Sequence, residues 1–275
     1  MRRSGALPTL RRRIVGRLLG DSSRHIVRAW RGVRRRVPLE PSLSLRVGRR
    51  FIRSHGLAVT RGPFTGLVFP RAAIGAAPLA PKLIGAYELE LHEALEERIA
   101  AQPSIVVNVG SGEGFYAVGF ARRLAQTWVV AFDADPAARR LSRLCARANG
   151  VEARLEQRGS ATREALEELA LGPDALLFVD CEGCEEVLLD PERLPQLRTT
   201  PVIVELHEHL VPGVGERLTA RFRGSHELTT ICAADRTTFD LGGPFASWPE
   251  HERTALLDEG RPPWMSWLIM VPRPS

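Results

Sequence analysis

Short apolar runs alternate with amphipathic segments over residues 86–275. Runs of about five apolar residues predict strands, whereas apolar residues that recur every three or four positions predict helices. The predicted strands cover residues 104–109, 128–132, 153–157, 175–180, 201–206, 227–232 and 267–271. The predicted helices cover residues 86–102, 114–125, 136–149, 162–171, 185–194 and 215–222.

Regular alternation of strands and helices predicts an α/β fold with a mostly parallel seven-stranded sheet flanked by helices. The segments 105–107 and 202–204 are apolar at every position, which is typical of strands buried on both faces. Ligands of such sheets bind beyond the carboxyl ends of the strands. The residues that follow each strand are therefore the candidates for chemistry.

The first 61 residues have a different character. They hold 17 arginines against two acidic residues, Asp21 and Glu40, although the whole chain carries a net charge of only +6. Apolar residues at helical spacing, such as Leu10 and Ile14, predict a basic extension that is partly helical or disordered. Such an extension could meet nucleic acid or an anionic membrane surface, or it could be a solvated segment that packs on the main domain.

Residues 62–85 are rich in glycine, proline and alanine and predict a linker with a short hairpin near 67–69. The chain thus divides into an extension (1–61), a linker (62–85) and a domain (86–275). It shows neither a membrane-spanning run nor a secretory signal, which favours a cytoplasmic protein. The oligomeric state stays open.

Four cysteines are too few for a disulfide framework in a chain of this size, and they predict reduced thiols. They are Cys145, Cys181, Cys184 and Cys232. A single Cys-x-x-Cys pair is a weak signal for structural zinc, which needs about four ligands. We expect Cys181 to be a small buried residue and Cys184 to begin a helix.

A glycine-rich loop follows the strand at 104–109 and precedes a helix. Its residues are Gly110, Ser111, Gly112, Glu113 and Gly114. Glycine lets a backbone turn tightly and approach a ligand, and the helix offers unpaired N–H groups. A dinucleotide site would read G-x-G-x-x-G, and Phe115 stands where that pattern has its last glycine. The difference favours a ligand without a pyrophosphate.

The next strand ends at Asp133, 19 residues after Gly114. A carboxylate at this position can accept hydrogen bonds from both hydroxyls of a ribose. The alternative is a helix-capping or surface aspartate ahead of Pro136. After a glycine-rich loop at this distance, we favour ribose binding.

Three blocks resemble known motifs. Asn-Val-Gly-Ser-Gly-Glu-Gly at 108–114 and Ala-Phe-Asp-Ala-Asp-Pro at 131–136 resemble the first two motifs of class I S-adenosylmethionine-dependent methyltransferases. Phe-Val-Asp-Cys-Glu-Gly-Cys-Glu at 178–185, followed by Ile-Val-Glu-Leu-His at 203–207, resembles the FkbM-type family. The likeness covers about residues 86–210. The family usually has aspartate where this chain has Asn108.

This resemblance implies a Rossmann-like methyltransferase fold that binds S-adenosylmethionine. The residues that it assigns to cofactor binding are Gly110, Ser111, Gly112, Glu113, Gly114, Asp133, Ala134, Ser160, Ala161 and Asp180. The glycine-rich loop would cradle the methionyl part, Asp133 would hold the ribose, and Ser160 and Ala161 would flank the adenine. Asp180 would face the reacting end, and residues 87–91 look like a helix that lids the cofactor.

Methyl transfer to a hydroxyl needs a positioned nucleophile and is helped by a general base. The candidates are Asp180, Glu182, Glu185, Glu205, His207, Glu208 and His209. We take Asp180, Glu205 and His207 as catalytic. His207 is a natural base with an unperturbed pKa of about 6.5, although a structural histidine is an equal alternative. These side chains and His209 could also hold a divalent ion, but the spacing is not diagnostic and we assign no metal ligand.

The sequence after the fourth strand, Asp-Cys-Glu-Gly, differs from the Asn/Asp-Pro-Pro-aromatic block of amino-group methyltransferases. No Pro-Cys pair is present for attack on a pyrimidine. We therefore favour O-methylation of a small molecule, such as a sugar or a secondary metabolite. Two alternatives stay open: an RNA methyltransferase that uses the basic extension, and an inactive adaptor that binds the cofactor.

Overall fold

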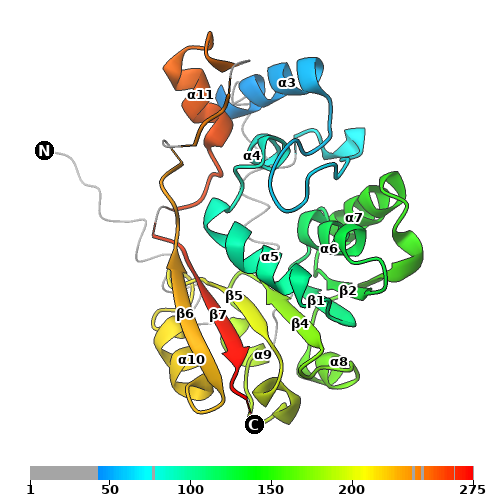
Figure 1. Ribbon diagram of the computed structural model, residues 1–275, viewed down its shortest axis with the longest axis vertical. Coiled ribbons are helices and arrows are strands. Elements are labelled where there is room, and N and C mark those ends of the chain that lie inside the picture. Colours follow the sequence, from blue (N-terminus) through cyan, green and yellow to red (C-terminus); the bar gives the residue numbers. More distant parts are fainter. Residues whose placement is uncertain (1–42, 76–77, 237–238, 243–244, 263, 275) are drawn as a thin grey trace, which may run out of the picture. The chain divides into compact units, whose positions relative to one another are not determined.

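The computed structural model describes residues 43–75, 78–236, 239–242, 245–262 and 264–274. Its sheet has seven strands in the order β3-β2-β1-β4-β5-β7-β6 (Figure 1). The strands are β1 (Ile105–Val109), β2 (Trp128–Phe132), β3 (Leu155–Arg158), β4 (Ala175–Val179), β5 (Val202–Leu206), β6 (His226–Cys232) and β7 (Ser266–Pro272). All neighbours are parallel except β7, which runs antiparallel to β5 and β6. The predicted α/β fold with a mostly parallel seven-stranded sheet flanked by helices is thereby confirmed.

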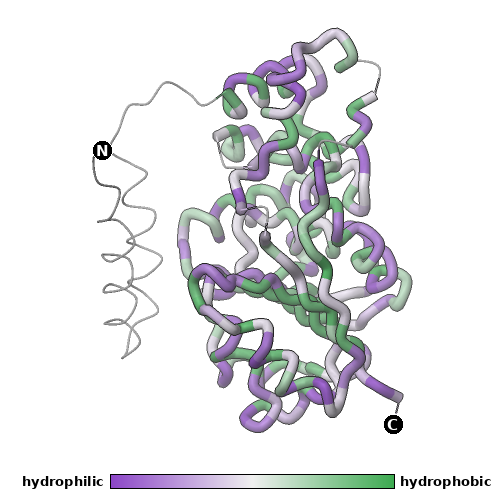
Figure 2. The backbone as a smooth tube through the Cα atoms, turned by 90° about the vertical axis from the view of Figure 1, so that its left-hand side faces the viewer, coloured by the Kyte–Doolittle hydropathy of each residue, from purple (hydrophilic) through white to green (hydrophobic). Residues whose placement is uncertain are grey.

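Helices cover both faces of the sheet. They are α3 (Leu43–His55), α4 (Leu79–Ile84), α5 (His92–Ala100), α6 (Phe115–Arg123), α7 (Pro136–Ala148), α8 (Arg163–Glu167), α9 (Glu185–Leu188), α10 (Val214–Phe222) and α11 (Glu250–Leu257). Apolar residues of α5, α6 and α7 pack on one face, and those of α8, α9 and α10 pack on the other. The strands β1, β2, β4, β5 and β7 between these layers are hydrophobic along most of their length (Figure 2).

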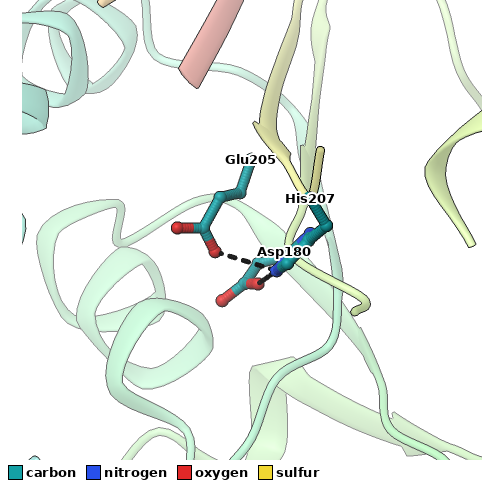
Figure 3. Close-up of side chains that lie close together, drawn as sticks. All are labelled: Asp180, Glu205 and His207. Atoms are coloured by element: carbon teal, nitrogen blue, oxygen red, sulfur yellow. Dashed lines mark ion pairs between the residues drawn. The ribbon is translucent and has the colours of Figure 1, made fainter. Parts of the chain in front are cut away.

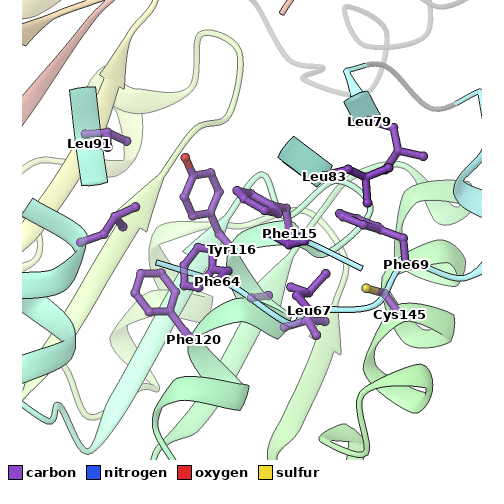
Figure 4. Packing of buried hydrophobic residues seen from close by; sticks show 14 of the residues in the cluster. Phe64, Leu67, Phe69, Leu79, Leu83, Leu91, Phe115, Tyr116, Phe120 and Cys145 are labelled. Atoms are coloured by element: carbon purple, nitrogen blue, oxygen red, sulfur yellow. The ribbon is translucent and has the colours of Figure 1, made fainter. Parts of the chain in front are cut away.

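Residues 43–85 belong to the same compact unit as the sheet. Phe64, Leu67 and Phe69 are buried, and the Phe64 ring meets Phe115 edge-on at 5.3 Å between centroids (Figure 4). A Cβ on Gly119 would lie 2.5 Å from the Phe64 ring, so helix α6 offers glycine where this ring packs. The expected linker therefore differs from the structure, because its glycines and prolines turn the chain inside the core. The rest of the predicted extension, residues 1–42, lies outside the described residues.

Several predicted elements are shorter in the structure. The helix expected at 86–102 begins only at His92, because Glu88 has a left-handed φ of 47° and a 3-10 turn, Leu89–Leu91, follows it. The helix expected at 185–194 ends at Leu188, just before Asp190-Pro191. Helices α4 and α11 were not expected, and α3 lies within the stretch that was expected to be partly helical. Among the described residues, no helix is long and apolar enough to span a membrane.

Candidate cofactor and active site

The glycine-rich loop joins β1 to α6 at the carboxyl edge of the sheet. Gly110, Gly112 and Gly114 all have positive φ, at 84°, 53° and 96°. A Cβ on Gly110 would overlap the carbonyl oxygen of Asp180, and one on Gly114 would lie 2.6 Å from the Ser142 hydroxyl of α7. Around Gly112, in contrast, no described atom lies within 4 Å of that position. Two glycines thus serve close packing, and the middle one faces open space.

Replacing Gly110 with alanine is expected to lower the free energy of unfolding by more than about 3 kcal/mol, because backbone would have to move away from the new methyl group. Gly112→Ala is the matched control. It shares the positive φ but meets no described neighbour, so its cost is the backbone term of about 1–2 kcal/mol. Urea unfolding of the two variants measures the difference. Equal losses would show that close packing at Gly110 is not what requires glycine.

Asp133 lies directly after β2 and connects to the glycine-rich loop. One carboxylate oxygen accepts a hydrogen bond from the Gly112 amide at 2.8 Å, and the other accepts one from the Asp135 amide at 2.8 Å. The cap of α7 is Asp135, whose side chain accepts from the Ala137 amide. Asp135, and not Asp133, is therefore the residue that caps this helix. Asp133 is instead held at the tip of β2, beside the open face at Gly112.

Other predicted cofactor residues occupy varied surroundings. Ser160 and Ala134 are exposed, and Ala161 is half-buried against the apolar layer of α8. Glu113 forms a buried ion pair with Lys82 of α4. The Lys82 ammonium lies 4.3 Å from the centre of the Tyr87 ring. Sequence reasoning missed this pair, although Lys82 is the one lysine of the chain.

The three predicted catalytic residues come together at the carboxyl ends of β4 and β5 (Figure 3). The Nε2 atom of His207 lies 3.3 Å from a Glu205 oxygen and 3.5 Å from an Asp180 oxygen. On the other side of the ring, Nδ1 lies 2.6 Å from a carboxylate oxygen of Glu185, the first residue of α9. Glu182 is the fourth carboxylate, at 3.8 Å from Nε2. His207 is thus enclosed by acidic groups, while His209 is exposed on its outer side.

These carboxylates change the protonation of His207. Burial alone lowers its pKa, but hydrogen bonds with Glu185 and Glu205 and the charge of Asp180 raise the pKa to about 11. His207 is therefore an imidazolium at neutral pH, in contrast to the free base expected from the ordinary pKa. Burial, followed by the neighbouring Glu205, raises the pKa of Asp180 well above its ordinary value. In its ionised form, a carboxylate with a raised pKa is a stronger base than an ordinary one.

A second ionic network lies next to this cluster. It links two arginines, Arg236 and Arg261, to four carboxylates, Glu88, Glu90, Glu205 and Glu259. Arg261 reaches Glu88 and Glu90 at 2.7 Å and Glu205 at 3.0 Å. The network therefore fixes the segment around Glu88 to the chain that precedes β7. Sequence reasoning missed it, because its members come from segments far apart along the chain.

Glu88 gives the protein a pH-dependent stability. Burial raises its pKa from 4.5 to about 7, although Arg261 opposes the shift. The folded state thus favours the protonated form of Glu88. The resulting gain in the free energy of unfolding is fully present below pH 4.5 and is lost as the pH rises through 7. The loss amounts to about 3 kcal/mol at most.

Glu88→Gln removes this titration. We expect urea unfolding to show a smaller fall in stability between pH 4.5 and pH 8 for the variant than for the wild type. The substitution also changes the contact with Arg261 and with it the absolute stability of the variant, so only the slope is informative. Parallel pH profiles for the two proteins would contradict the assignment.

The structure corrects one expectation about the cysteines. Cys181 and Cys184 form a disulfide, whereas Cys145 is buried and free and Cys232 is exposed and free. The intervening Glu182 and Gly183 have positive φ, at 57° and 105°. This tight turn brings the two Cα atoms to 5.6 Å. Spacing alone did not distinguish such a bridge from a pair of thiols.

No family model matches the chain, and no curated protein matches it. Among solved structures it is similar to cofactor-bound Rv0187 from MTB, with 17% identity, coverage of 98% of this chain and 99% of that one, and a TM-score of 0.46. It is also similar to an O-methyltransferase from Bacillus cereus in complex with SAH, with 12% identity, coverage of 86% of this chain and 93% of that one, and a TM-score of 0.43. For the METTL16 MTase domain the identity is 14%, the coverage is 84% of this chain and 80% of that one, and the TM-score is 0.49. At such identities the function rests on the residues of this chain.

Proposed function

We propose that the chain is an S-adenosylmethionine-dependent methyltransferase that methylates a hydroxyl group of a small molecule. The observation that carries this proposal is the contact between the glycine-rich loop and the acidic cluster. The Asp180 amide donates to the Val109 carbonyl at 2.9 Å, and Gly110 packs on the Asp180 backbone. A ligand held by the loop would therefore present its reactive end to Asp180.

Two buried side chains support a ligand at the loop. The Asn108 amide is fully buried, and neither its oxygen nor its nitrogen has a hydrogen-bond partner among the described residues. The Ser111 hydroxyl, three residues on, also has none there. Unsatisfied buried polar groups cost about 1–3 kcal/mol each and are rare in native proteins. A polar ligand, or water that accompanies it, would satisfy them.

We keep the cofactor assignment that the resemblance implies. The loop residues Gly110, Ser111, Gly112, Glu113 and Gly114 would hold the methionyl part. Asp133 would accept the ribose hydroxyls, with Ala134 beside it, and Ser160 and Ala161 would flank the adenine. The acidic cluster around His207 would complement the positive charge of a sulfonium.

The chemistry of the cluster suits a hydroxyl acceptor. When bound, the cofactor supplies an electrophilic methyl group. Asp180 would accept the proton of the acceptor hydroxyl as the oxygen attacks. Glu205 and Glu185 hold the His207 ring from both sides, so the imidazolium keeps its orientation and stabilises the carboxylates. Positioning and exclusion of water supply the rest of the rate enhancement.

A divalent cation is a second candidate in the same reaction. Asp180, Glu205 and His207 each offer one ligand atom, and these atoms lie within 4.8 Å of one another. Metal binding would displace the proton of the His207 imidazolium, because only the neutral ring is a ligand. Oxygen and imidazole ligands suit several divalent ions, which lower the pKa of a bound hydroxyl. Activity that is lost on dialysis against a chelator and restored by Mg²⁺ or Mn²⁺ would support this variant of the mechanism.

The proposed function is tested by release of S-adenosylhomocysteine in the presence of a panel of acceptors. We expect turnover with hydroxylated small molecules and none with total RNA. Turnover with RNA alone would favour the alternative in which the arginine-rich segment grips phosphates. Cofactor binding without turnover on any acceptor would favour an adaptor.

A further inference from the structure

The Cys181–Cys184 disulfide spans the turn that supplies most of the acidic cluster. Asp180, Glu182 and Glu185 all come from this turn, and they lie 3.5, 3.8 and 2.6 Å from the His207 ring nitrogens. Three of the four carboxylates that face His207 thus depend on one short segment. The disulfide closes that segment across its two central residues.

Besides the bridge, hydrogen bonds restrain the turn at Asp180, at Gly183 and at Cys184, whose carbonyl accepts from the amides of α9. The Asp180 amide bonds to Val109, and the Gly183 amide donates to the Glu185 carboxylate at 3.1 Å. Glu182, which carries a Cβ, adopts the left-handed region with φ 57°. Such a conformation costs about 1–2 kcal/mol and persists only where its surroundings enforce it. The covalent bridge is one such restraint, and its removal would let Glu182 and Gly183 relax.

The same turn supports the glycine-rich loop. A Cβ on Gly110 would overlap the Asp180 carbonyl and lie 3.3 Å from the Cys181 Cα. The two segments are therefore in direct backbone contact. A change in the path of the chain at Cys181 would therefore displace the backbone at Gly110.

The bridge is suited to local control. A loop closed over two intervening residues adds less to global stability than a long loop would, since stabilisation by a disulfide grows with loop length. Cys181 and Cys184 are half-buried, and Glu182 between them is exposed, so the turn lies at the surface, where a small thiol can approach it. Cys145 differs: burial raises its pKa to about 12, which keeps it a thiol.

We propose that Cys181 and Cys184 form a thiol–disulfide exchange site whose oxidised state holds the acidic cluster and the glycine-rich loop in their working arrangement. A dithiol reductant attacks one sulfur, the S–S bond breaks, and a mixed disulfide forms. The second thiol of the reductant then displaces the remaining protein thiol. In total, two electrons and two protons pass to the protein, which gains two thiols, and the reductant becomes a cyclic disulfide. The link to catalysis rests on the proposed function; the structural change does not.

Hydrogen exchange of the full chain, with and without dithiothreitol, tests the structural part. We expect the amides of residues 180–188 and 110–114 to exchange at least tenfold faster after reduction, with the strands unchanged. Thiol alkylation and mass spectrometry of the same samples establish the redox state. Unchanged exchange in protein shown to be reduced would overturn the proposal, as would a bridge that resists excess dithiothreitol under native conditions.

Matched variants separate this site from the other cysteines. The double variant Cys181→Ser, Cys184→Ser should show the fast exchange without reductant and no further response. Cys232→Ser, at an exposed free thiol on β6, should keep the full response of the wild type. A double variant that exchanges as slowly as the oxidised wild type would contradict a role of the bridge.

Calorimetric titration with S-adenosylmethionine tests the functional part. We expect the affinity to fall about tenfold on reduction of the wild type and to stay constant in the double variant. Absence of binding in both redox states would argue against the proposed function, while the exchange result would still decide the redox site. Equal affinity in the two states would restrict the proposal by removing its link to the cofactor.

Discussion

Asp133→Ala is expected to weaken binding of S-adenosylmethionine by at least tenfold, a loss of about 1.4 kcal/mol or more. The carboxylate would accept charge-assisted hydrogen bonds from the ribose, and such bonds contribute about 1.5–3 kcal/mol each. The carboxylate also accepts hydrogen bonds from the amides of Gly112 and Asp135, so its removal takes away a restraint on the glycine-rich loop. Calorimetric titration of wild type and variant measures both the affinity and the enthalpy.

Asp135→Ala is the control for this experiment. It lies two residues away and removes the cap of α7, so it should cost about 1 kcal/mol of stability and leave the affinity nearly unchanged. Asp133→Asn adds a second comparison, because it keeps one oxygen acceptor and removes the charge. Wild-type affinity in Asp133→Ala would remove the ribose contact. A folded wild type that does not bind would overturn the cofactor itself.

Asp180→Asn is expected to lower kcat by about 10²–10⁴, the range for loss of a general base. The substitution keeps the size of the side chain and removes its ability to accept a proton. Affinity for S-adenosylmethionine should change much less than kcat, because the backbone of Asp180, which contacts Gly110, stays in place. Initial rates with an acceptor identified in the panel, together with calorimetry, give both quantities.

Glu182→Gln is the matched control for Asp180→Asn. Glu182 lies in the same turn and faces the same His207 nitrogen, but its side chain is 71% exposed, against 23% for Asp180. We expect a change in kcat of less than about threefold, because exposed charges interact weakly. Equal losses in the two variants would indicate that the total charge of the cluster matters and that proton transfer to Asp180 does not.

The sequence predicts the positions of those candidate site residues that directly follow a strand along the chain. The position of Gly110 after β1, of Asp133 after β2 and of Asp180 after β4 could be predicted from strand patterns alone. The meeting of Asp180 with His207 could be inferred from topology, since neighbouring parallel strands end at the same edge. These predictions need only the order of elements and the direction of strands.

Other features depend on contacts between distant segments, which periodicity does not report. Arg261 meets Glu88 across 173 positions, and no pattern near either residue indicates the pair. The raised pKa of His207 likewise requires knowledge of Glu185 and Glu205 at its two nitrogens. Composition also misled: the glycines and prolines of residues 62–85 suggested a linker, whereas the apolar residues between them decide the packing.

The packing of Phe64 between α6 and the preceding segment has a consequence for variation within cells. Phe64 and Phe69 lie far from His207 in sequence, yet they are part of the apolar layer that supports α6 and, through it, the glycine-rich loop. Truncating such rings costs several kcal/mol, roughly 3–5, a large share of the stability of a typical domain. Proteins with substitutions at these positions would unfold more often and be degraded by cellular proteases. Their phenotype would be a low protein abundance, with normal turnover for each molecule that stays folded.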